Sequence, residues 1–320
     1  MADRVERLGN SWVQHGAVNR RVYLMKLDLG DIPEILRDLD ELAGDRRYGK
    51  IFVKIPASAE AVFTEAGYRR EAFVPGFFGG KEAASFMARY PDPERGAEWR
   101  PDAVAEVVEL VRRLVPEAMR GAELPDRESI SMEAGEALSN LASSSADSTG
   151  EVVGAGESDF RLRVLAPADA SNMAALYREV FRSYPFPILD PAYLRACMEN
   201  HVRYVGVECN GALAAIASAE MDPANRNAEM TDFATRTEFR RKGLAQRLLA
   251  RMEREVRGVG IRTAYTIARA GSAGMNLTFA RSGYLFGGTL VNNTHIAGGI
   301  ESMNVWYKPL GGCGRAKGYR

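Results

Sequence analysis

The chain has 320 residues, which suggests one to three domains and is enough to bury a core without disulfides or metal ions. Apolar residues make up 46% and charged residues 26%, as in an ordinary globular protein. Basic and acidic residues both number 42, and this balance argues against a nucleic-acid or anionic-membrane partner.

The cysteines and histidines predict neither a disulfide framework nor a metal site. Cys197, Cys209 and Cys313 are few and scattered, and the three histidines have no ligand spacing. The N-terminus lacks the apolar core of a signal peptide, and no run reaches the ~18 apolar residues that span a bilayer. We therefore expect a cytoplasmic protein with reduced thiols.

The first predicted region covers residues 1–120. Apolar runs at 22–25 and 50–55 predict strands with an amphipathic helix between them, and residues 102–120 predict a second amphipathic helix. Residues 121–159 are rich in Ser, Gly, Glu and Ala, which is typical of a flexible linker.

The second predicted region covers residues 160–310 and is followed by a tail, 311–320. Its elements follow the order β-α-α-β-β-β-α-β-α-β-β, which predicts an α/β fold: a mixed sheet flanked by helices. An Asn210-Gly211 pair between two apolar runs predicts a hairpin, and Asp190 before Pro191 predicts a helix start.

The two regions contain an internal echo. The segment Phe63–Tyr68 mirrors Phe279–Tyr284, and Gly79-Gly80 mirrors Gly298-Gly299. The first region thus resembles half of the second and lacks a counterpart of the loop described next. We interpret it as a packing or substrate-side element.

The loop in question is a basic, glycine-containing segment between a predicted strand and a predicted helix, comprising Arg240, Arg241, Lys242, Gly243, Leu244 and Ala245. Unpaired amides at a helix N-terminus and the helix dipole favour an anion there. Gly243 allows close approach of the ligand to the backbone, and the basic side chains add positive charge. The segment therefore predicts a site for a pyrophosphate or similar anion.

Residues 160–308 resemble the GNAT acetyltransferase superfamily, whose acetyl-CoA pyrophosphate loop matches this segment. The resemblance implies acetyl-CoA as co-substrate and a splayed pair of strands, 228–235 and 263–268. The pantetheine would lie between these strands against the backbone of Phe233, Ala234 and Thr235, whose amides would also polarise the thioester carbonyl.

Longer segments resemble the β-lysine N6-acetyltransferase family within this superfamily. They include 9–16 and 23–27 near the start, and 227–235, 265–270 and 297–307 further on. This resemblance covers both ordered regions and implies transfer of an acetyl group to the N6 amine of β-lysine, giving a compatible solute.

An alkyl ammonium must lose a proton before it attacks a thioester, so the site needs a base. Glu229 is the leading candidate because it lies eleven residues before Arg240, the offset of the glutamate base in related histone acetyltransferases. Asp232 is the second. Three residues apart on a strand, they would face opposite sides unless a bulge intervened, so one of them is expected to face the cleft.

Other candidates follow from the substrate and from the superfamily pattern. The usual general-acid tyrosine is replaced by Phe279, and Asn276 is a candidate for contacting pantetheine or for a structural role. A substrate with two amines and a carboxylate needs charged partners and an apolar wall. The candidates for these are Tyr184, Phe186, Asp190, Arg269 and Glu301.

Three functions remain open at this point. The first is an acetyltransferase for a small amine, the second is an acetyltransferase for a peptide lysine, and the third is a non-catalytic acyl-CoA-binding module. The predicted partner is a small molecule, with a homodimer left open.

Overall fold

The computed structural model describes residues 3–115, 160–181, 184 and 186–311. These residues form one mixed sheet of 13 strands with helices on its faces, in the order β1-β2-β3-β4-β6-β5-β12-β13-β11-β10-β9-β8-β7. The predicted α/β class is confirmed. The predicted linker and nearly all of the tail lie outside the described residues.

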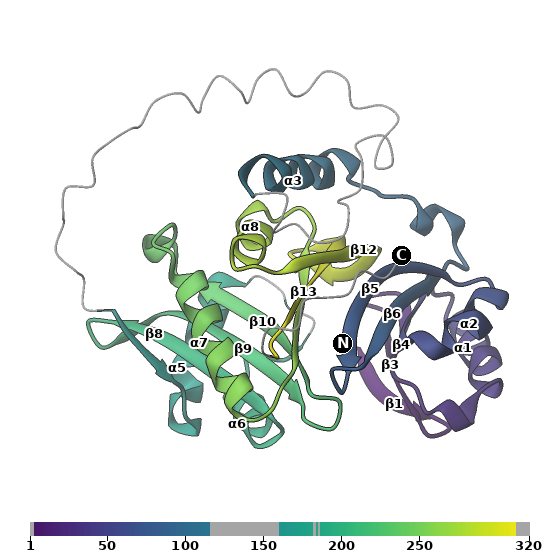
Figure 1. Cartoon of the computed structure of the whole chain (residues 1–320), viewed down its shortest axis with the longest axis horizontal. Coiled ribbons are helices and arrows are strands. Elements are labelled where there is room, and N and C mark those ends of the chain that lie inside the picture. The colour runs from purple at the N-terminus through teal and green to yellow at the C-terminus, as the bar shows by residue number, and fades with distance from the viewer. Residues whose placement is uncertain (1–2, 116–159, 182–183, 185, 312–320) are drawn as a thin grey trace.

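The N-terminal half of the sheet, β1 to β6, occupies the right side of Figure 1. The elements of this region are β1 (Arg4–Leu8), β2 (Ser11–Gly16), β3 (Arg21–Lys26), α1 (Glu34–Asp45), β4 (Lys50–Pro56), α2 (Glu60–Glu65), β5 (Arg69–Phe78), β6 (Glu82–Arg89) and α3 (Pro101–Leu114). The hydrophobic pattern did not predict β1 and β2, because both are short and β1 is largely exposed and charged.

The C-terminal half of the sheet, β7 to β13, occupies the left and centre of Figure 1. Its elements are β7 (Arg161–Val164), α5 (Ala170–Val180), α6 (Pro191–Glu199), β8 (Val202–Cys209), β9 (Ala212–Asp222), β10 (Asn227–Thr235), α7 (Leu244–Gly258), β11 (Thr263–Arg269), α8 (Ala273–Arg281), β12 (Leu285–Ile296) and β13 (Gly299–Pro309). The predicted element order is confirmed, including the Asn210-Gly211 hairpin, where both residues have positive φ.

The two halves have the same internal strand order. In the N-terminal half β3 is followed by β4, β6 and β5, and in the C-terminal half β10 is followed by β11, β13 and β12. The Phe63 and Tyr68 rings meet edge to face at 5.3 Å between centroids, and the Phe279 and Tyr284 rings meet in the same way at 5.2 Å. The echo in the sequence therefore coincides with matching positions in the two halves.

The halves join where β5 pairs with β12, at Ala72 and Gly288. Gly288 has a φ of +140°, and a Cβ there would lie 2.2 Å from the Glu71 carbonyl oxygen. A side chain at this position is therefore excluded by both conformation and space. The glycine lets two strands approach closely enough to make one continuous sheet.

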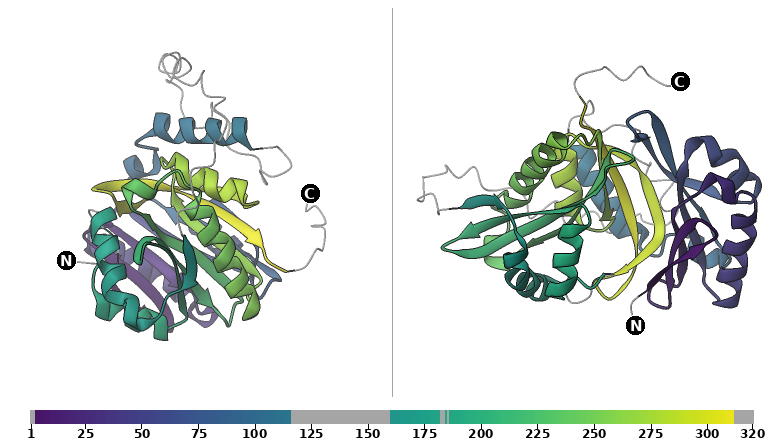
Figure 2. Two further views of the ribbon diagram at one scale, coloured as in Figure 1. Left: turned by 90° about the vertical axis from the view of Figure 1, so that its left-hand side faces the viewer. Right: turned by 90° about the horizontal axis from the view of Figure 1, so that it is seen from below.

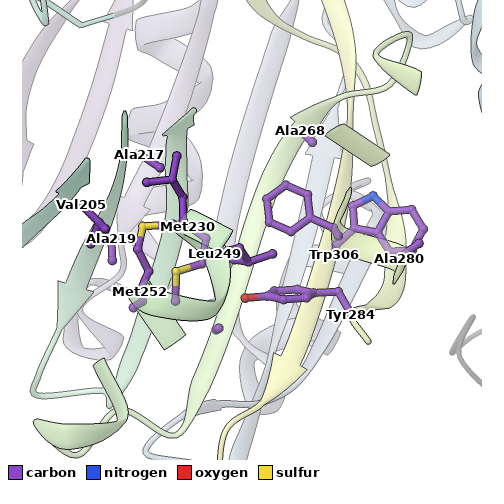
Figure 3. Packing of buried hydrophobic residues seen from close by; sticks show 14 of the residues in the cluster. Val205, Ala217, Ala219, Met230, Leu249, Met252, Ala268, Ala280, Tyr284 and Trp306 are labelled. Atoms are coloured by element: carbon purple, nitrogen blue, oxygen red, sulfur yellow. The ribbon is translucent and has the colours of Figure 1, made fainter. Parts of the chain in front are cut away.

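The largest core lies between the C-terminal half and its helices α7 and α8. Figure 3 shows Met230 of β10, Leu249 and Met252 of α7 and Trp306 of β13 packed together there. Helix α3 belongs to this core, since Val104, Val108 and Val111 are buried in it and α3 lies beside α8 (Figure 1). After the N-terminal strands, the chain therefore crosses to the helices of the C-terminal half through α3.

A second contact brings the two halves face to face. Phe52, Phe77 and Phe86 of the N-terminal half pack against Tyr265 and Val305 of the C-terminal half. The sheet is strongly curved around β5 and β12, as the view from below in Figure 2 shows. Side chains of β3 and β4 consequently reach the centre of the C-terminal half. None of the helices in the described ranges is both long and apolar enough to cross a membrane.

Candidate active site

The site begins where β10 and β11 diverge. These strands are paired in parallel at only three positions, from Asn227 with Thr263 to Glu229 with Tyr265. Beyond Tyr265, β11 continues along β13, while β10 continues along β9. The splayed pair that the sequence predicted is therefore present. It leaves one backbone edge of β10 after Glu229 without a neighbouring strand among the described residues.

A β-bulge follows on the other edge of β10. Thr231 pairs with Ser218 and Ala234 with Ile216, so that two residues of β10, Asp232 and Phe233, oppose one residue of β9. Asp232 has a φ of +54°, a conformation that few residues other than glycine adopt. Bulges of this kind re-aim side chains and concentrate near functional sites.

The bulge places both candidate bases on one face of the sheet. Glu229 lies directly opposite Glu220 of β9, and Ser218, two residues along β9, points to the same side. The Ser218 hydroxyl donates a hydrogen bond of 2.7 Å to Asp232. The expectation that strand alternation would separate Glu229 from Asp232 is therefore wrong, because the extra residue at the bulge reverses the alternation.

The surroundings of the two carboxylates differ. Both oxygens of Asp232 accept a hydrogen bond, one from Ser218 and the other from the Tyr184 hydroxyl at 2.5 Å, and the residue is buried. Burial raises the pKa of Asp232, and these hydrogen bonds limit the rise. The Tyr184 hydroxyl orients this carboxylate, and the predicted role of the Tyr184 ring as a substrate wall stays a prediction.

Glu229 is half-buried and faces the N-terminal half. The Tyr265 hydroxyl hydrogen-bonds to it, and the ammonium group of Lys54 from β4 acts on it electrostatically. Burial raises its pKa above the ordinary value for a glutamate, while Lys54 and Tyr265 oppose that rise. Glu229 is therefore the carboxylate with fewer fixed hydrogen-bond partners, which leaves it freer than Asp232 to take a proton from a substrate.

A cavity of about 220 Å³ adjoins the carboxylates, between α6 and the ends of β8 and β9. It is lined by Tyr193, Ala196, Cys197, Asn200, Val202 and Glu220. Enclosure by protein atoms, together with Asp232 and Glu229, raises the pKa of Glu220 to about 8, although its side chain keeps an exposed surface. Cavities for drug-sized ligands measure ~300–1,000 Å³, so this one suits a small molecule.

The predicted anion loop lies at the start of α7. Arg240, Arg241, Lys242 and Gly243 are all exposed, and no side chain within the described residues caps the helix. Gly243 has a φ of +70°, and its Cβ position faces open space. The first-turn amides of a 15-residue helix are thus free to bind an anion.

The family model for acetyltransferases of the GNAT family matches residues 172–284. The chain is also 31% identical over 306 residues to the β-lysine N(6)-acetyltransferase of Methanococcus maripaludis, an alignment that covers 96% of this chain and 98% of that protein. The enzyme with the same name from Methanosarcina mazei is 32% identical, with 88% and 99% covered. This chain belongs to the GNAT acetyltransferase family. It is an N-acetyltransferase.

Among solved structures, the ribosomal-protein-S18-alanine N-acetyltransferase of Escherichia coli is similar to this GNAT chain with a TM-score of 0.43 and 17% identity. The similarity covers 50% of this chain and 99% of that one.

GNAT acetyltransferases use acetyl-CoA, and two features of this chain fit that molecule. The free amides and basic side chains at Arg240–Ala245 suit a pyrophosphate. The unpaired edge of β10 at Phe233–Thr235 suits an extended pantetheine chain, which can bind a strand edge through its amides. The N-terminal half has Asp28 and Asp31 between β3 and α1, where the corresponding loop would lie, and this acidic pair disfavours an anion.

Several candidates from the sequence have other partners in this GNAT fold. Arg269 forms an ion pair with Glu301, with Nε 2.7 Å from Oε2, and Arg100 also contacts Glu301. Glu301 is thus engaged by two guanidinium groups, and a role of Arg269 or Glu301 in binding the substrate stays a prediction. Asp190 caps α6 through the Ala192 amide at 2.8 Å. Phe186 is partly exposed beyond the described cavity lining.

Asn276 is a structural residue. It is fully buried, and its amide group donates to the Arg269 and Ser272 carbonyls. Its carbonyl oxygen accepts from Asn304 at 2.9 Å and from the Trp306 indole at 2.8 Å. The candidate role in pantetheine binding is therefore wrong, since all its hydrogen-bonding groups are already in use. Phe279 is likewise buried, against Phe233 and Tyr284, and offers no proton.

We expect Asn276→Ala to destabilise the protein by about 2–4 kcal/mol without changing the KM for acetyl-CoA. The substitution leaves two buried donors, the Asn304 amide and the Trp306 indole, without their acceptor. The Arg269 and Ser272 carbonyls keep their backbone donors. Each unsatisfied buried group costs about 1–3 kcal/mol, partly relieved by relaxation or water. Thermal and urea unfolding measure the first effect, and initial-rate kinetics measure the second. A raised KM with unchanged stability would contradict this assignment.

The sequence did not single out Lys54, Glu220 or Ser218. A signal existed for Lys54, because it interrupts an otherwise apolar run from Ile51 to Ile55, and charged residues are seldom buried without a partner. Ser218 and Glu220 gave no signal of their own, since their position depends on pairing with β10.

Proposed function

We propose that this chain transfers the acetyl group of acetyl-CoA to the N6 amine of β-lysine. The observation that carries the proposal is the group of carboxylates, Glu229, Asp232 and Glu220, beside the point where β10 and β11 diverge. Ionised carboxylates attract a substrate with two ammonium groups, and binding of such a substrate favours the ionised form of Glu220, whose pKa is otherwise raised to about 8. Similarity along nearly the whole chain to two relatives named for this reaction supports the choice of amine.

Acetyl-CoA supplies an activated acetyl group as a thioester. The proposed contacts are the α7 amides with Arg240, Arg241 and Lys242 for the pyrophosphate, and the β10 edge at Phe233–Thr235 for the pantetheine. Backbone amides at that edge are preorganised to stabilise negative charge on a carbonyl oxygen, an effect worth several kcal/mol in acyl transfer.

Glu229 is the proposed general base. It takes a proton from the substrate ammonium, directly or through a water molecule, so that the amine becomes a nucleophile. Asp232 is the less suitable of the two carboxylates because Tyr184 and Ser218 occupy both of its oxygens. We propose that it fixes Tyr184 and adds negative charge that attracts the ammonium groups.

The N-terminal half is proposed as the substrate-side element of a two-region enzyme. It contains the same strand order as the C-terminal half, lacks the basic loop, and contributes Lys54 and Tyr23 to the surroundings of Glu229. A face closed in this way suits a small amine more than a peptide, which would need an open groove.

The test is a substrate panel followed by thiol release. Purified protein is incubated with acetyl-CoA and β-lysine, α-lysine, ornithine, putrescine or a lysine peptide. We expect β-lysine to give the highest kcat/KM, and mass spectrometry with NMR to place the acetyl group on N6. A preference for α-lysine or for the peptide would overturn the substrate. Tight acetyl-CoA binding without release for any amine would favour the non-catalytic module.

A further inference from the structure

Lys54 stands out among the lysines of β4 by its surroundings. Lys50, four residues earlier, is fully buried and bound by Glu71 at 2.8 Å and by the Val291 carbonyl at 2.6 Å, as a structural lysine is. Lys54 is half-buried, and no carboxylate in the described ranges lies at ion-pair distance from it. The positive charge of Lys54 therefore acts on neighbouring carboxylates among the described residues without forming an ion pair with them.

Lys54 lies beside the rings that surround the proposed base. Its ammonium nitrogen is 5.4 Å from the centre of the Phe77 ring and 5.8 Å from that of Tyr265. Tyr265 is also the residue that hydrogen-bonds to Glu229. Tyr23 of β3 also acts on the ammonium group of Lys54 and raises its pKa.

We propose that Lys54, from the N-terminal half, is a positioning residue that keeps the Glu229 carboxylate ionised for the reaction. This inference rests on the proposed role of Glu229 as base. An opposite charge within ~4–6 Å stabilises an ionised carboxylate, whereas burial and neighbouring carboxylates favour its protonation. The titratable and charged groups that face Glu229 or Lys54 are Lys54 of β4, Tyr23 of β3, Glu220 and Asp222 of β9, Asp232 of β10 and Tyr265 of β11.

Lys54 is the one cation in this set, which is drawn from the described residues, and Glu229, Glu220 and Asp222 interact with it electrostatically. Burial lowers the pKa of Lys54, but Tyr23, Glu229 and Asp222 together raise it by more, so the ammonium form persists at neutral pH. Without this charge, burial and Asp232 would act on Glu229 opposed by the Tyr265 hydrogen bond alone. The N-terminal half would thus complete the catalytic site electrostatically, and the C-terminal half alone would be a weaker catalyst.

The experiment compares Lys54→Met with Lys54→Arg, which keeps the charge, and with Lys26→Met, which removes an exposed lysine at the end of β3. The pH dependence of kcat/KM is measured with whichever amine the wild-type enzyme acetylates best. We expect Lys54→Met to shift the acidic limb of the kcat/KM profile to higher pH by about one unit. The variant should lose about tenfold in kcat/KM below that limb and little above it. Lys54→Arg is expected to restore the limb, and Lys26→Met to leave it unchanged.

A second measurement does not depend on turnover. Carbon-13 NMR of the glutamate carboxyls, with Glu229 assigned through Glu229→Gln, is expected to show a higher pKa for Glu229 in Lys54→Met. An unmoved acidic limb and an unmoved Glu229 titration would overturn the inference. So would a loss confined to β-lysine and absent for its decarboxylated analogue 1,4-diaminopentane, because that pattern identifies Lys54 as a ligand of the substrate carboxylate. If β-lysine is not acetylated, the proposed substrate is wrong, but the Glu229 titration still tests the role of Lys54.

Discussion

Glu229→Gln is expected to lower kcat by about 10²–10³-fold at neutral pH, because removal of a general base typically loses 10²–10⁴-fold. The carboxamide keeps the shape of the side chain and its hydrogen bond with Tyr265 but cannot accept the ammonium proton. The deficit should shrink as the pH approaches the amine's own pKa of ~10.4, where free amine is present without a base. Initial rates from pH 6 to 10 measure both effects.

The raised pKa of Glu229 fixes the sign of the wild-type pH dependence. A base must be deprotonated to act, so kcat/KM should rise with pH through a limb above the usual glutamate range. That limb should be absent in Glu229→Gln. Glu238→Gln makes the same chemical change at an exposed residue and should leave the profile unaltered. If Asp232→Asn showed the full loss of kcat and Glu229→Gln kept wild-type rates, Asp232 and not Glu229 would be the general base.

Gly243→Asp is expected to raise the KM for acetyl-CoA by about 10–100-fold with a smaller change in the KM for the amine. A carboxylate at this position would enter the open space at the proposed anion site, and like charges near a protein surface at about 4 Å repel by ~1–4 kcal/mol. The backbone there, with φ +70°, accepts Asp more readily than most residues. Initial-rate kinetics and acetyl-CoA titration by calorimetry measure the change.

The matched control for this loop is Gly243→Asn, which has the same shape and the same tolerance of positive φ but no charge. We expect it to raise the KM only a few-fold, so that the difference between the two variants isolates the electrostatic part. Higher salt should narrow that difference, because screening weakens exposed charges. Equal effects of Asn and Asp would show that backbone geometry, and not charge, governs binding.

Much of the C-terminal half could be predicted from its sequence because its signals are local. Hydrophobic periodicity located the helices, the Asn210-Gly211 pair located a hairpin, and the segment from Arg240 to Ala245 located a strand-to-helix turn at the start of α7. Each of these depends on a few consecutive residues. The echo between Phe63–Tyr68 and Phe279–Tyr284 was also visible, since each pair of rings packs within one short helix and its following turn.

Side-chain roles in the site were less predictable. Arg269, Glu301 and Asn276 carried suitable chemistry, but their partners lie on other strands, and only the pairing of β11 with β13 shows that they are already engaged. Strand alternation predicted opposite faces for Glu229 and Asp232 unless a bulge intervened, and the bulge is present because it is defined by the register of two strands. Strand alternation alone cannot reveal it.

The sequence by itself determined the order of elements in the C-terminal half, and through its resemblance to GNAT acetyltransferases it indicated the family and the candidates Glu229 and Arg240–Ala245, because these signals are local. The tertiary structure decided which groups act on Glu229. The joining of β5 to β12 and the curvature around them bring Lys54, distant in the sequence, beside Tyr265 and the proposed base. The physical reason is that electrostatic interactions depend on distance and burial, and both are set by how the two halves of the sheet pack.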